Sequence, residues 1–266
     1  MEIHKPKPWR CWPELLKEVG TIVIGVLIAL AAEQGVEWLH WRHQIQEGRG
    51  AIVADHKRIL GQLGARDAAS PCISRRLDEL EAILDHATAN GRLPPLGDIS
   101  DPPREIWSMR GWDALVSGQT LAHLSREDAT RFSAQATRLN YLQAVLGNEI
   151  DEWSVLRTMR GPGRRLSDAE AANLRAALSS ARTNAFRLRN AGDQLGGMIV
   201  DSGLLTKAEV AAAWRGGAEY EAKSRFSICH PISAIGAPPY DTSRLTAPPR
   251  APEQSYDTAL APFVAR

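Results

Sequence analysis

The hydrophobic pattern of this chain is dominated by one uncharged run near the N-terminus, at residues 19–32. As a helix, these 14 residues rise about 21 Å, which is short of the roughly 30 Å hydrocarbon core of a bilayer. Leu16 on one side and Val36 on the other extend the apolar surface. We therefore expect a transmembrane helix over 14–41, preceded by a cytoplasmic segment over 1–13.

Two pairs of tryptophans flank the run, as expected of residues at the two membrane interfaces. They are Trp9, Trp12, Trp38 and Trp41. The alternative is a signal peptide, because Ala29-Leu30-Ala31 fits the small-x-small cleavage rule. Helical spacing continues beyond that point through Glu33 and Glu37, so we favour an uncleaved anchor.

Lysines and arginines around the run predict its orientation. Residues 1–18 carry four of them, whereas residues 33–50 carry two. Cytoplasmic flanks are the richer ones, which predicts a single-pass membrane protein with the N-terminus in the cytoplasm and the body in the periplasm or exterior. A four-residue spacing of small residues at Thr21, Gly25 and Ala29 predicts a helix-packing face, through which two copies could associate.

Beyond the run, apolar positions recur at the helical period and strand signals are nearly absent, which predicts an all-α protein. A helical stalk is expected over 42–66. A new helix should then begin at the capping Ser70 and Pro71 and end at Gly91. Residues 93–103 contain four prolines and predict a loop, and a less regular helix is expected over 105–117.

Three candidate capping boxes open the remaining helices, with a hydroxyl and a carboxylate each accepting a backbone N–H. They are Ser125 with Asp128, Ser167 with Glu170, and Thr206 with Glu209. The first two helices are long and meet at a Gly-Pro-Gly connection over 161–163, so they should form an antiparallel hairpin. These elements predict a helical-bundle domain over 67–225, followed by a Pro-rich extended tail over 226–266.

Composition and missing motifs argue against several classes of function and identify none. The 266 residues are 44% hydrophobic and 24% charged, as in ordinary globular proteins, and the net charge of +1 gives nucleic acid no general attraction. The sequence has no CxxC, no Gly-rich phosphate loop, no HExxH and no GxSxG. We therefore expect no nucleic-acid partner, no cofactor, no metal and no catalytic residue.

Two of the three cysteines, Cys72 and Cys229, fall in the predicted exported part, where thiols oxidise. We predict a disulfide between them, which would tie the start of the C-terminal segment to the first body helix. Two alternatives remain: both thiols are inert, or Cys72 is reactive because the first turn of a helix lowers the pKa of a thiol.

Three other clusters have both a functional and a structural interpretation. One helix face carries Glu37, His40 and His43, which could hold a metal, although headgroup contact is the interpretation we favour. An acidic cluster consists of Glu149, Asp151 and Glu152. We interpret it as a solvated face rather than a hydrolytic pair, because neighbours on a helix point about 100° apart. The third cluster consists of the tryptophans of the body, Trp107, Trp112, Trp153 and Trp214. We interpret them as core residues rather than as the lining of a ligand pocket.

The opening of the chain, from Leu16 to Leu30 and on through 38–42, resembles a broad family of bacterial single-pass membrane proteins of unknown function. The resemblance covers about residues 14–45 and implies a location, the bacterial inner membrane with the body in the periplasm, but no chemistry. Our leading hypothesis is a non-enzymatic, membrane-anchored helical bundle that binds a partner protein or small ligand at the periplasmic face. The alternatives are an accessory subunit of a membrane complex and a secreted enzyme released after Ala31.

Overall fold

A computed structural model of the chain describes residues 12–225 and 227–232. Over these residues the protein is all-α, as predicted, with five α-helices. They are α1 (Trp12–Asn90), α2 (Arg110–Ser117), α3 (Arg126–Leu156), α4 (Asp168–Asp201) and α5 (Lys207–Lys223). Two 3₁₀ turns complete the helical elements, η1 (Thr120–His123) and η2 (Arg157–Met159).

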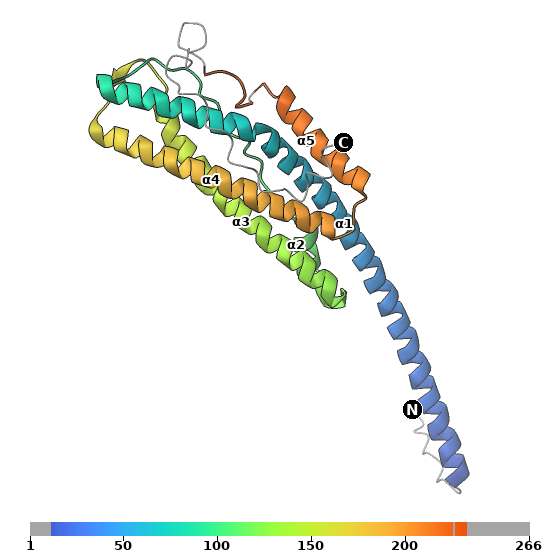
Figure 1. The fold of residues 1–266 in the computed structure, drawn as a ribbon. Coiled ribbons are helices and arrows are strands. Elements are labelled where there is room, and N and C mark those ends of the chain that lie inside the picture. Colours follow the sequence, from blue (N-terminus) through green and yellow to red (C-terminus); the bar gives the residue numbers. More distant parts are fainter. Residues whose placement is uncertain (1–11, 226, 233–266) are drawn as a thin grey trace, which may run out of the picture.

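Helix α1 is continuous over 79 residues, from an exposed rod at its N-terminal end to the far end of the bundle (Figure 1). The predicted break between residues 64 and 70 is therefore wrong, because Pro71 lies inside the helix. Proline removes one helical hydrogen bond and favours a bend. Buried residues on both sides of it, Ala69 and Ile73, belong to one apolar cluster, and this shared packing holds the two parts of α1 together.

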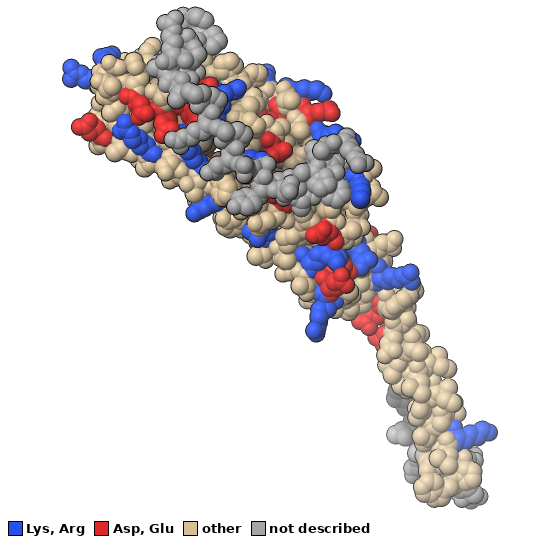
Figure 2. All heavy atoms as spheres, viewed as in Figure 1, with Lys and Arg blue, Asp and Glu red and all other residues tan. Residues whose placement is uncertain are grey.

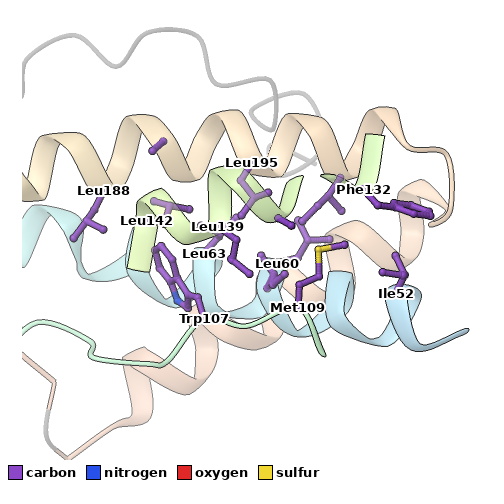
Figure 3. Packing of buried hydrophobic residues seen from close by; sticks show 14 of the residues in the cluster. Ile52, Leu60, Leu63, Trp107, Met109, Phe132, Leu139, Leu142, Leu188 and Leu195 are labelled. Atoms are coloured by element: carbon purple, nitrogen blue, oxygen red, sulfur yellow. The ribbon is translucent and has the colours of Figure 1, made fainter. Parts of the chain in front are cut away.

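The bundle forms around α1, which packs against α4 and α5, while α3 packs against α4 as the predicted hairpin (Figure 1). The prediction of a stalk over residues 42–66 needs correction, because most of this stretch lies inside the bundle. Its apolar face joins side chains of α3, α4 and α5 in one buried cluster (Figure 3). The α1 members of that cluster are Ile52, Ile59, Leu60 and Leu63.

The helices α1 and α5 approach each other at backbone distance. A Cβ atom on Gly217 of α5 would collide with the carbonyl group of Gly61, and one on Gly64 would collide with the backbone of Trp214. Only glycine permits these two approaches, so the glycines of α1 and α5 determine how closely the helices pack.

The three predicted N-caps are present, but only one is a complete capping box. Thr206 and Glu209 each accept the other's backbone N–H. Ser125 and Ser167 accept the predicted N–H groups, whereas the carboxylates of Asp128 and Glu170 pair with arginines instead. These arginines, Arg49 and Arg164, offer the carboxylates stronger, charge-assisted hydrogen bonds.

Two further predictions differ from the structure in the region between α1 and α3. Helix α2 begins at Arg110 rather than at residue 105, because side chains from α1 and α3 hold the preceding backbone in a non-helical form. Gln143 accepts a hydrogen bond from the N–H of Trp107, and Arg58 donates one to the carbonyl of Ser108. The short antiparallel pair of β1 (Arg92–Leu93) and β2 (Arg164–Arg165) was not predicted, since two residues are too few for a period.

Candidate functional site

The most distinctive surface of the molecule is residues 15–39 of α1, which we call the apolar segment. The helix that carries it is long and apolar enough to cross a membrane, and none of its most apolar window is buried. Figure 2 shows it as a rod that projects from the body and carries few charged side chains. From Leu16 onward its large hydrophobic side chains, such as Ile22, Leu27 and Val36, are 44–70% exposed.

The predicted interface tryptophans have different surroundings. Trp9 lies outside the described residues. Trp12 is exposed near the start of α1. Trp38 is also exposed, and the guanidinium of Arg42 lies 5.1 Å from its ring centroid. Such a pairing of an aromatic face with a cation suits the headgroup level of a bilayer.

Trp41 instead marks the junction between the apolar segment and the body. Its ring stacks on the His123 imidazole of η1, with centroids 3.9 Å apart and planes 18° apart. One turn later, the Thr120 hydroxyl donates to the Gln44 side-chain oxygen at 3.0 Å. The end of the body that carries η1 is therefore fixed to α1 within about one helical turn of Trp41.

The predicted helix-packing residues lie on the exposed rod. The Thr21 hydroxyl donates to the carbonyl of Lys17 at 2.8 Å, and a Cβ atom on Gly25 would meet no atom within 4 Å. Ala29 is also exposed. The face made by these three residues is open, and self-association through it stays a prediction.

The residues considered as possible metal ligands, Glu37, His40 and His43, do not assemble around a common point. The Gln44 amide donates to His40 Nε2 at 3.0 Å, and His43 Nε2 lies 3.2 Å from the carboxylate of Glu47. Throughout the described residues, no group of three or more His, Cys, Asp or Glu side chains is arranged to hold a metal ion.

The predicted disulfide is present in the structure, with Cys72 and Cys229 joined at an S–S distance of 2.02 Å. It attaches residues 227–232 to α1, and the apolar Ile228 and Ile232 of this segment are buried against the bundle. The description of 226–266 as an extended tail therefore needs correction for these residues. The rest of the predicted tail, from residue 233, lies outside the described residues.

Arg76 of α1 also holds the segment over 227–232 against the bundle. Its side chain is buried and donates to the carbonyls of Ile99, Ile228 and His230. Burial lowers the pKa of Arg76, and the adjacent Glu79 carboxylate, 2.9 Å away, opposes that shift. The local sequence carries no signal for this role, because two of the three carbonyls lie more than 150 residues away.

The acidic cluster divides between the core and a groove. Glu149 is buried and forms a two-pronged ion pair with the buried Arg66 of α1, so the solvated-face interpretation is wrong for this residue. Asp151 and Glu152 line a polar groove of about 380 Å³ between α3 and α4, together with Arg187. The three carboxylates therefore do not form one site.

A second buried polar contact, in addition to the pair of Arg66 and Glu149, connects α1 to α3. His56 Nε2 donates to Gln135 Oε1 at 2.9 Å, and the Gln135 amide donates to the carbonyl of Met198. Burial lowers the pKa of His56, while Gln135 and the carboxylate of Asp55 oppose the shift. The imidazole is held neutral between packed helices, which suits a structural role.

The tryptophans of the body belong mainly to the core, as predicted. Trp107, Trp153 and Trp214 are buried, and Trp112 is half-buried against the same packing. Their large rings fill the space between helices rather than lining a ligand pocket.

Comparison with known proteins adds no family to this description: no protein-family model, no curated protein and no solved structure matches the chain. The resemblance of residues 14–45 to a bacterial membrane-protein family stays a prediction.

Proposed function

We propose that this chain is a single-pass protein of the bacterial inner membrane that holds a helical, disulfide-linked body at the periplasmic face, where the body acts by binding rather than by catalysis. The observation that carries the proposal is the exposed apolar segment. A contiguous apolar surface of this size is rare on soluble proteins and marks a surface that another apolar phase covers.

The dimensions of the segment suit a bilayer. Leu16 and Val36 are 20 residues apart, which is about 30 Å along a helix and equals the hydrocarbon thickness of a typical membrane. Trp12 and Trp38 lie just outside these limits, where aromatic anchors belong. With the segment placed in this way, η1 and the Trp41 junction lie at the headgroup level.

Two observations support a periplasmic body. Residues 1–18 carry four lysines and arginines, whereas residues 33–50 carry two, which favours a cytoplasmic N-terminus. The disulfide joins two cysteines of the body, and such bonds persist in oxidising compartments such as the periplasm.

The preference for binding rests on how the ionisable groups of the core are used. Arg66 and Glu149 neutralise each other, and Arg76 is occupied by Glu79 and backbone carbonyls. Such groups stabilise a fixed shape rather than exchange protons with a substrate. A rigid body with open grooves on its surface, attached to a membrane, suits a binding protein.

The experiment is a pair of C-terminal fusions in a bacterial host, one to alkaline phosphatase and one to green fluorescent protein, with fractionation of the cells. We expect the chain to remain in the membrane pellet after alkaline carbonate extraction. Alkaline phosphatase should be active and the fluorescent protein dark. Recovery of the full-length chain in the soluble fraction would contradict the anchor, and the reverse reporter pattern would contradict the orientation.

A further inference from the structure

A cleft of about 630 Å³ lies between the loop over 98–105 and the C-terminal end of α5, beside the disulfide-linked segment. We call it the α5 cleft. Helix α5 contributes Tyr220 and Glu221 to its lining, the loop contributes Glu105, and the segment contributes His230 and Pro231.

Glu221 is the unusual member of this lining. Its side chain is 7% exposed, and its buried Oε1 atom has no hydrogen-bond partner. A carboxylate removed from water without a counter-charge is costly, so proteins nearly always pair such a group. Glu219, two residues earlier on the same helix, is exposed and pairs with Lys223, which shows the ordinary arrangement for comparison.

The positive charges around the cleft are already engaged. Arg104 pairs with Asp101, which also receives both hydrogen bonds of Arg157, at 2.7 and 2.9 Å. Arg225 makes an interaction of its own. Among the described residues, no cation is therefore assigned to the carboxylate of Glu221, and an anionic ligand would meet like charge there.

The walls of the cleft combine polar and charged side chains, among them Asp98, Asp101 and Arg104, with an apolar and aromatic part. Pro102, Pro103 and Pro231 contribute aliphatic ring surface, and the Tyr220 ring is 67% exposed. The face of an aromatic ring attracts an organic cation, and proline rings pack against a methylene chain. A buried carboxylate beside this apolar part matches a ligand with a positively charged end and an aliphatic stem.

We propose that the α5 cleft binds an aliphatic amine, with the ammonium group paired to the Glu221 carboxylate and the methylene stem against Tyr220 and the prolines. The site would give the periplasmic body a small-molecule ligand. The geometry of the cleft does not depend on the side of the membrane, so failure of this inference would leave the proposed topology untouched.

The test is calorimetric titration of the full chain in detergent micelles with putrescine, using 1,4-butanediol as the uncharged analogue. We expect putrescine to bind and butanediol not to bind. Glu221→Gln should weaken putrescine binding at least ~10-fold, because a buried charge pair is lost. Glu219→Gln, on the exposed face of the same helix, should leave the affinity unchanged.

A second variant keeps the test independent of how Glu221→Gln folds. Tyr220→Ala changes an exposed side chain and should weaken putrescine binding about two- to five-fold through loss of the aromatic face. Absence of putrescine binding to the unaltered chain would overturn the proposal. Equal weakening by Glu219→Gln and Glu221→Gln would also overturn it, because binding would then reflect general surface charge, and so would tighter binding of inorganic phosphate than of putrescine.

Discussion

Arg66 and Glu149 face each other across α1 and α3 with almost no access to water. Each also falls on the apolar stripe of its helix, since Glu149 lies seven residues after Leu142 and four before Trp153. A charged residue on an apolar stripe is a sequence signal for a buried ion pair. The identity of its partner carries no such signal, because Arg66 is 83 residues away.

Glu149→Ala should lower the free energy of unfolding by about 3–5 kcal/mol, because it leaves the Arg66 guanidinium buried without a counter-charge. Denaturant titration followed by circular dichroism measures this loss. Asp85→Ala is the matched control, since it removes an exposed ion pair with Arg175 and should cost less than ~1 kcal/mol. Similar losses in the two variants would show that burial of the first pair has no energetic weight.

Asp193 provides a pH-dependent test. Burial raises its pKa to about 6, with the Asp67 carboxylate adding to the shift and Arg189 opposing it. A carboxyl group with a raised folded-state pKa stabilises the fold while protonated, below its ordinary pKa of 3.8, and this contribution is lost as the pH rises through about 6.

Asp193→Asn should therefore raise the melting temperature above pH 6 and change it little at pH 4. Solvent screening of this partly exposed group limits the effect to about 1 kcal/mol, or roughly 2–4 °C in a domain of this size. Thermal unfolding of both proteins between pH 4 and pH 8 measures the difference. Parallel curves for the two proteins would contradict the assigned pKa.

At the scale of helices, capping residues and apolar period located α3, α4 and α5 from the sequence, because both signals are local. The continuity of α1 through Pro71 and the start of α2 were missed because distant partners decide them. Packing of Ala69 and Ile73 carries α1 through Pro71, and side chains of other helices hold the backbone before Arg110 in a non-helical form. The α5 cleft was missed for the same reason, since its lining comes from three segments.

The contact between α1 and α5 gives a test at this scale. Gly217→Ala places a methyl group against the backbone of Gly61 and should cost about 1–3 kcal/mol of stability through overpacking. Gly216→Ala, at the neighbouring position with open space, should instead stabilise the helix by about 0.5–1 kcal/mol. Denaturant midpoints of the two variants should move in opposite directions, and a common direction would contradict the close approach.

At the scale of the whole molecule, helix α1 connects two regions with different surroundings. Its N-terminal part is the exposed apolar segment, and its C-terminal part packs in the body. No side chain of the apolar segment belongs to either buried cluster of the described residues. Membrane insertion and stability of the body should therefore respond to different substitutions.

Leu27→Arg should test that separation. An arginine near the centre of the span opposes insertion by about 2.5–3.5 kcal/mol, so more of the chain should be extracted by alkaline carbonate. The melting temperature of the body should stay the same, because Leu27 is exposed and touches no core residue. Leu27→Ile serves as the control. A lower melting temperature in Leu27→Arg would show that the two parts are energetically coupled.

The bond between Cys72 and Cys229 also determines how the molecule would bear tension. A pull applied to the chain beyond residue 232, against an N-terminal end held in lipid, would pass through Cys229 to Cys72 and then down α1. Helices α2 to α5 lie outside that covalent route, within the loop that the bond closes. Mechanical load would therefore bypass α2 to α5, and of the α5 cleft it would act only on His230 and Pro231, so that most of the fold could keep its shape under tension.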